Sequence, residues 1–184
     1  MTRTLTPAWQ PVDADGMEDL VLTLDDKGFR AESVVMRVED ATRFGLRYSV
    51  TGDAQWRSRR VEISLLDGDR TLVLQGDGVG RWTDGDGTPL PLLDGALDPD
   101  ITCTPFTNTL AIRRLKLAIG ESADIVTAHV TVPALTISAD PQRYTRLGET
   151  LYRYESRDSD FTRDIAVDDD GLVLDYPDRF RRLG

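Results

Sequence analysis

The chain has 184 residues, of which 40% are hydrophobic and 29% charged, as in a single globular domain that spans residues 1–184. Its formal net charge of −10 disfavours nucleic acid and anionic membrane surfaces as partners. We see no stretch of ~18 apolar residues that could span a membrane and no apolar signal segment. Because the chain has a single cysteine, Cys103, we expect a cytoplasmic protein without an internal disulfide.

Alternating apolar and polar residues predict antiparallel strands through the first part of the chain. The series begins at residues 19–24, where Leu20, Leu22 and Leu24 share one face. The same period of two continues in four more segments, at 29–38, 44–50, 60–66 and 70–76.

The middle of the chain is less regular. Residues 76–100 form a stretch of 25 residues rich in Gly, Asp and Pro. A stretch this long in a compact domain is either functional or richer in structure than its composition suggests. Residues 107–120 fit a helix that Thr109 would cap, and also a strand from Arg113 onward. We expect a short helical turn that runs into a strand.

Strand patterns return in the second part of the chain. They cover residues 123–132, 134–138, 149–156, 161–167 and 172–176. Turn signals recur about every 8 to 12 residues along the whole chain, which is typical of an antiparallel meander, sandwich or open barrel. We therefore predict an all-β fold with little helix and about 11 to 13 strands.

Motifs for nucleophilic or metal chemistry are scarce. The only histidine, His129, falls within a predicted apolar strand, and Cys103 falls in a predicted Thr-rich strand, where a small buried thiol is common. A zinc site normally needs several Cys and His, and the acidic turns lack the spacing of a calcium loop. We predict no metal and no cofactor.

One carboxylate pair is the remaining catalytic option. Asp98 and Asp100 are two positions apart, so on a strand their side chains share a face and could act together on a glycosidic bond. Alternatively, the two acids pair with Arg113 and Arg114 and hold the segment in place. The pattern alone identifies an all-β domain without a standard catalytic set.

Several longer stretches resemble the putative glycolipid-binding family of bacteria. They are "LDGALDPDI", "TPFTNTLAIRRL", "PQRYTRL", "YRYES" and "VDDDGLVLDYPDRFRR", and "GMEDLVL" and "YSVTGDAQWRSRRV" in the amino-terminal half are similar in kind and order. The resemblance covers nearly the whole chain. Ala96 or its neighbour stands where the family has a cysteine, which excludes a thiol role there. Ala111 replaces a family proline, and Asp178 replaces a glycine.

The resemblance implies one long, curled antiparallel sheet, an open barrel-like β-roll similar to the periplasmic lipoprotein carriers, and from that shape the binding of a glycolipid or lipid. On the family stretch we predict one hydrogen-bonded ligand site near the mouth of a cavity. Its residues are Asp98, Asp100, Asn108, Arg113 and Arg114, with Trp82, Gln142 and Tyr144 nearby. Arginine forks grip carboxylate or phosphate at two points, although the Asp–Arg pairs fit a purely structural role equally well.

We predict a non-catalytic protein that binds an amphipathic ligand, a glycolipid or another lipid. Two alternatives stay open. The first is a metal-independent hydrolase or isomerase that uses Asp98 and Asp100, and the second is a scaffold that docks a protein partner.

Overall fold

The computed structural model describes residues 1–39 and 42–184, and this part of the chain is mostly β-structure. The strands are β1 (Arg3–Leu5), β2 (Ala8–Pro11), β3 (Asp15–Leu24), β4 (Gly28–Glu39), β5 (Thr42–Asp53), β6 (Ser58–Leu65), β7 (Thr71–Gly76), β8 (Trp82–Asp84), β9 (Asp98–Ile101), β10 (Ser122–Thr131), β11 (Thr136–Arg146), β12 (Leu151–Ser156), β13 (Thr162–Val167), β14 (Val173–Tyr176) and β15 (Phe180–Leu183). The helices are η1 (Pro91–Leu93) and α1 (Phe106–Leu115). None of the helices in the described ranges has the length and apolarity to cross a membrane.

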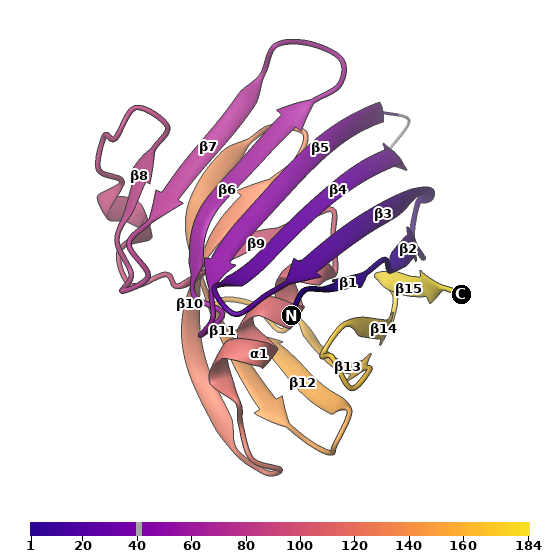
Figure 1. Ribbon diagram of the computed structural model, residues 1–184. Helices are drawn as coiled ribbons and strands as arrows, with labels where there is room; N and C mark the ends of the chain where they lie inside the picture. Colours follow the sequence, from indigo (N-terminus) through magenta and orange to yellow (C-terminus); the bar gives the residue numbers. More distant parts are fainter. Residues whose placement is uncertain (40–41) are drawn as a thin grey trace.

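All strands belong to one curled sheet that does not close into a barrel (Figure 1). Its order is β8-β7-β6-β5-β4-β3-β2-β15-β14-β13-β12-β11-β10-β9, with β1 paired to β3. Neighbours are antiparallel except β9, which lies parallel to β10. The predicted all-β, curled antiparallel fold is therefore confirmed, with one parallel pair at an end of the sheet.

The two ends of the chain join the two halves of the sheet. Strand β2 lies between β3 and the last strand, β15, and Trp9 of β2 is opposite Arg182. The Trp9 side chain is fully buried, and its indole N–H donates a hydrogen bond of 2.7 Å to the carbonyl of Val173. This tryptophan therefore ties the first strands to the last ones across the junction.

Helix α1 lies inside the curl, between the two halves of the sheet (Figure 1). Its first seven residues, Phe106 to Ile112, are all buried. Phe106 and Leu110 pack in a mainly aliphatic core cluster, whereas Ile112 packs among the tyrosines of a second cluster. The helix therefore contacts both halves of the sheet.

The predicted strand from Arg113 onward is wrong. The helix begins after Pro105, continues to Leu115 and ends where Lys116 adopts a left-handed conformation with φ 51°. Thr109, the predicted cap, is fully buried within the helix. Burial on several sides explains the error, because a helix surrounded by protein shows no clean amphipathic period.

The irregular stretch 76–100 contains more structure than its composition suggests. It holds β8, η1 and the start of β9. Trp82 on β8 is buried and donates from its indole nitrogen to the carbonyl of Ala96 at 2.8 Å. Cys103, predicted on a strand, lies in the turn between β9 and α1.

Candidate functional site

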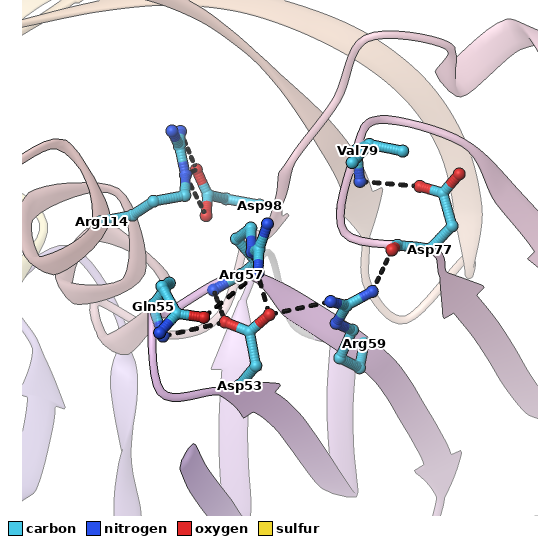
Figure 2. A network of polar contacts seen from close by, with 8 residues as sticks. All are labelled: Asp53, Gln55, Arg57, Arg59, Asp77, Val79, Asp98 and Arg114. Carbon is cyan, nitrogen blue, oxygen red and sulfur yellow. Dashed lines mark hydrogen bonds and ion pairs between the residues drawn. The ribbon is translucent and has the colours of Figure 1, made fainter. Parts of the chain in front are cut away.

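Strand β9 and helix α1 form a tight unit because both acids of β9 face the helix. Arg114 near the end of α1 donates to Asp98 Oδ2 from Nε at 2.9 Å and from Nη2 at 2.5 Å (Figure 2). At the other end, Thr107 Oγ1 donates to Asp100 Oδ1 at 3.1 Å. The i, i+2 spacing on one strand face thus fastens the strand to both ends of the helix.

The pair formed by Asp98 and Arg114 is largely buried. Asp98 is 0% exposed and the Arg114 side chain 12% exposed. Burial raises the pKa of Asp98, and the hydrogen bonds and charge of Arg114 oppose that rise. This geometry is that of a structural ion pair.

Asp100 belongs to a different polar group, which is centred on Gln142. The buried Gln142 Nε2 donates to Asp100 Oδ2 at 2.7 Å, to Asp140 Oδ2 at 2.6 Å and to Thr127 Oγ1 at 3.1 Å. Burial raises the pKa of Asp140, and the charge of Asp100 adds to the rise. An amide nitrogen has two protons for these three acceptors, so the two carboxylates are held close together with hydrogen-bonding capacity to spare.

Asn108 and Tyr144 make a third polar contact. The Tyr144 hydroxyl donates to Asn108 Oδ1 at 2.8 Å, and Asn108 Nδ2 donates to the carbonyl of Pro105 at 3.1 Å. Both side chains are buried. This contact fixes the start of α1 against β11.

Of these residues, Asp100, Asn108 and Asp140 line a cavity of about 610 Å³, which we call the aromatic cavity. Its lining comes from β4, the β9–α1 turn, α1, β10, β11, β12, β14 and β15, so both halves of the sheet contribute. The polar residues of the lining include Asp100, Asn108, His129, Asp140 and Asp158. Its aromatic residues are Tyr154, Phe161, Tyr176 and Phe180.

The aromatic rings form a continuous surface. The Tyr154 and Phe161 centroids are 5.9 Å apart, and those of Phe161 and Tyr176 are 6.4 Å apart. The guanidinium of Arg179 lies 4.9 Å from the Phe161 centroid, and that of Arg37 lies 5.5 Å from the centroid of Phe180. The cavity thus combines tilted aromatic rings, carboxylates and cations in one lining.

A buried carboxyl behind this cavity was missed by our sequence analysis. Glu18 on β3 accepts hydrogen bonds at Oε1 from Tyr48 at 2.5 Å, Thr104 at 2.9 Å and Ser33 at 3.0 Å. Its Oε2 has no partner within the described ranges, and burial raises the pKa of Glu18 to about 7. A signal was present in the sequence, because Glu18 falls on the same strand face as Leu20 and Leu22.

The structure divides the predicted ligand site among several places. Asp100 and Asn108 line the aromatic cavity, where Gln142 and Tyr144 support them. Arg113 lies elsewhere, with its guanidinium 4.9 Å from the ring of Trp56. The remaining residues, Asp98, Arg114 and Trp82, make the internal contacts described above, so the predicted residues do not form one hydrogen-bonded cluster.

The arrangement limits the available chemistry. Cys103 is buried, and burial raises the pKa of its thiol, which disfavours the nucleophilic thiolate. Within residues 1–39 and 42–184, no group of three or more His, Cys, Asp or Glu is placed to hold a metal ion. The aromatic cavity is suited instead to a ligand with hydroxyl groups and an apolar face.

Comparisons with known proteins agree with this architecture. A family model described as "Putative glycolipid-binding" matches residues 6–182. Among solved structures, a DUF1089 family protein from Pseudomonas aeruginosa is similar to this chain, with 41% identity and a TM-score of 0.81. The similarity covers 90% of this chain and 92% of that one. No curated protein matches. Because the family model spans nearly the whole length, the chain belongs to the family described as "Putative glycolipid-binding".

Proposed function

We propose that the protein binds an amphipathic ligand, a glycolipid or another lipid with a hydroxylated head group, in the aromatic cavity and without transforming it. The observation that carries this proposal is the cavity of about 610 Å³ whose lining combines carboxylates with four aromatic rings. Ligand sites usually pair apolar surface with polar groups that orient the ligand, and polar residues make up most of this lining, which suits a head group. The family description points in the same direction.

The polar residues of the lining can bind the hydroxyl groups of a sugar. Asp100 and Asp140 share one amide donor, so each keeps lone pairs that can accept from a hydroxyl group. The carboxamide of Asn108 and the imidazole of His129 add further polar atoms to the lining. Four carboxylates, those of Glu39, Asp100, Asp140 and Asp158, line the cavity against two arginines, Arg37 and Arg179, so we expect a neutral rather than an anionic head group.

The aromatic residues of the lining can pack against the apolar face of a sugar ring or the first part of an acyl chain. Tyr154 and Tyr176 are each 8% exposed, and large rigid rings provide contact area at low entropic cost. A volume of about 610 Å³ accommodates a head group and part of a chain, and the rest of a long lipid would extend beyond the cavity. A cytoplasmic location, and with it a lipid precursor or free glycoside as ligand, is part of the proposal.

Native mass spectrometry of the freshly purified protein, followed by solvent extraction and lipid analysis, tests this function. We expect a stoichiometric adduct with an acyl or glycosyl mass. The adduct should be lost in Tyr154→Leu and in Asp140→Asn. Tyr152→Leu is the matched control, because Tyr152 lies two residues away on β12, is similarly buried, and lines a different cavity.

The proposal fails if folded Tyr154→Leu and Asp140→Asn keep the adduct at the wild-type level. It also fails if the wild-type protein is free of adduct and binds no member of a lipid and glycolipid panel. Equal losses in Tyr152→Leu and Tyr154→Leu would indicate general loosening of the tyrosine cluster and would likewise count against a specific site.

A metal-independent hydrolase is the second candidate, and one observation favours it. Two carboxylates bound to a single amide nitrogen line the aromatic cavity, and the pKa of one of them, Asp140, is raised. A raised pKa suits a general acid, and the partner carboxylate would act as nucleophile or base. The pair would be Asp100 with Asp140 rather than with Asp98, which is fully buried against Arg114. Cleavage of the recovered glycolipid by wild-type protein but not by Asp140→Asn would favour this candidate.

A further inference from the structure

We propose that a second cavity, at the end of helix α1, binds an oxyanion such as a phosphate or carboxylate group. This cavity, which we call the basic cavity, has a volume of about 690 Å³. It lies between the β5–β6 turn, the end of α1, the hairpin of β11 and β12, and the turn after β13. Three cationic side chains line it: Arg113, Lys116 and Arg146. This inference is independent of ligand binding in the aromatic cavity.

Arg113 is the central observation. It is half-buried, and its guanidinium is 4.9 Å from the Trp56 ring. In the part of the chain that the structure describes, it makes no side-chain hydrogen bond or ion pair. The adjacent Arg114, in contrast, donates to Asp98 from Nε and Nη2. A guanidinium has five N–H donors in a planar fork that matches the geometry of carboxylate and phosphate. Arg113 therefore presents unused donors to the basic cavity.

The surface beneath Arg113 is rigid. Trp56 is 8% exposed and stacks on Phe29, with ring centroids 4.8 Å apart and an interplanar angle of 18°. The guanidinium of Arg113 lies over this fixed Trp56 ring, and the contact limits the orientations that it can adopt. Such a preorganised cation loses little entropy when it binds an anion.

Two of the four non-glycine residues with positive φ in the described ranges lie at the same place. Trp56 has φ 63° and Lys116 has φ 51°, a left-handed region that residues other than glycine seldom adopt. Both residues line the basic cavity. Strained backbone persists where the surrounding structure over-determines it, and it clusters at binding and catalytic sites.

Arg146 adds a fixed positive charge. Its Nε, Nη1 and Nη2 donate to the carbonyls of Gly148, Leu117 and Glu149 at 3.0, 2.9 and 2.9 Å. These acceptors are neutral, so the guanidinium charge is held in place without being cancelled. It can therefore attract an anion in the cavity without itself moving.

Three acids, Glu149, Asp168 and Asp169, also line the cavity, but their charges are paired or screened. Asp168 is paired with Arg182 and accepts from the backbone N–H groups of Asp170 and Leu172 in its turn. Glu149 and Asp169 are exposed to solvent, where their charges are well screened. The half-buried interior next to Trp56 is therefore where an anion is favoured.

Inorganic phosphate and glycerol 3-phosphate serve as soluble probes, followed by NMR of ¹⁵N-labelled protein at constant ionic strength. The Trp56 indole N–H resonance, assigned with Trp56→Phe, should shift saturably with either probe but not with chloride. Arg113→Gln should weaken the apparent Kd at least about tenfold, as expected when a charge-assisted two-point contact is lost. Arg60→Gln, which removes a partly exposed charge of β6 that does not line the cavity, is the matched control and should leave the Kd unchanged.

Lys116→Gly separates binding from structure. Glycine accepts the left-handed conformation, so the melting temperature should stay the same or rise. The apparent Kd for phosphate should nevertheless weaken several-fold, because the ammonium group is gone. A purely structural role for these cations, as partners of the helix dipole, predicts an unchanged Kd.

Vesicles identify the source of the oxyanion. Co-sedimentation with phosphatidylglycerol vesicles but not phosphatidylcholine vesicles, lost in Arg113→Gln, would indicate a lipid head group. Phosphate binding without co-sedimentation would indicate a soluble phosphorylated metabolite. The inference is overturned if wild-type protein shows no saturable Trp56 shift, or if Arg113→Gln and Arg60→Gln bind phosphate equally. Tyr154→Leu should not affect this titration, so the result is separate from that for the aromatic cavity.

Discussion

The inner faces of the two halves of the sheet differ in chemistry. In the first half, β3 to β7, the inward positions are mainly aliphatic, as with Leu20, Leu22 and Ile63, which are 0–1% exposed. In the second half, β11 to β15, the inward positions include Tyr144, Tyr152, Tyr154, Tyr176 and Phe180. Flexible aliphatic chains interdigitate and fill space, whereas rigid rings with hydroxyl groups leave gaps where those groups need polar partners.

The two halves of the sheet therefore contribute differently to the two cavities. Both cavities that we consider for binding are lined by tyrosines of the second half, Tyr154 and Tyr176 in one and Tyr152 in the other. The first half closes most of the core and contributes fewer lining residues, Arg37 and Glu39 to the aromatic cavity and Ala54 and Trp56 to the basic cavity. Four substitutions test this difference between the two halves of the sheet.

Arg114→Met should have the largest effect, a loss of about 3–5 kcal/mol in the free energy of unfolding, because it leaves the fully buried Asp98 without its ion-pair partner. Urea denaturation measures this loss. The double variant Asp98→Leu/Arg114→Met should recover most of it. Wild-type stability in Arg114→Met would show that this pair does not hold β9 to α1. A role in ligand binding would then be the better explanation for the pair.

Glu18→Gln should change how stability depends on pH. The pKa of Glu18 is about 7 in the folded protein, above the ordinary value of 4.5, so the folded state keeps a proton that the unfolded state has lost between these pH values. Stability should therefore fall by about 3 kcal/mol as pH rises from 4.5 to 7 through this group alone, and Glu18→Gln should remove that contribution.

The measurement is the free energy of unfolding of both proteins at pH 5 and at pH 8. The difference between wild type and variant isolates Glu18, because the other titrating groups are common to both proteins. Parallel pH profiles would contradict the raised pKa. They would also show that this buried carboxyl on the inward face of β3 titrates at its ordinary pKa.

Tyr144→Phe should cost about 1–3 kcal/mol, because it leaves the buried Asn108 Oδ1 without its 2.8 Å hydrogen bond. Chemical denaturation measures this cost. Asn108→Leu combined with Tyr144→Phe removes both partners and should be less destabilising than the sum of the single changes. An effect below about 0.5 kcal/mol for Tyr144→Phe would show that the tyrosines of the second half are not fixed by such bonds.

Tyr154→Phe should have the smallest effect on stability, within about 0.5 kcal/mol, because its hydroxyl has no hydrogen-bond partner within residues 1–39 and 42–184. Its effect on ligand retention should exceed that of Tyr144→Phe, since Tyr154 lines the aromatic cavity. Denaturation and native mass spectrometry of both variants give the two rankings. If stability and retention follow the same order, the second half is a core like the first.

The sequence predicted the strands better than the site. Strands with a strict period of two, such as 19–24 and 29–38, lie within β3 and β4, because one face of each is buried. The short strands β1, β2, β8, β9 and β15 were missed, because three or four residues are too few to show a period. The stretch 76–100 was correctly suspected of holding more structure than a loop.

For the site, the sequence supplied correct residues but an incorrect grouping. It indicated that Asp98 and Asp100 would share a face if they lay on a strand, and on β9 both do face α1. It could not assign Asp98 to a buried ion pair and Asp100 to a cavity, because that depends on how far the helix covers each acid. Arg113 and Arg114 are neighbours in one motif, and the turn of the helix directs them to different environments.

The sequence by itself determined the fold class, the approximate strand positions and, through the resemblance, the family. Local alternation and turn chemistry encode these features within a few residues, and they hardly depend on distant contacts. Only the tertiary structure decided where β2 and β15 join the two halves, and which polar residues are buried, paired or open to a cavity. Those outcomes depend on contacts between residues far apart in the chain, where a shift of one position exchanges the inner and outer faces of a strand.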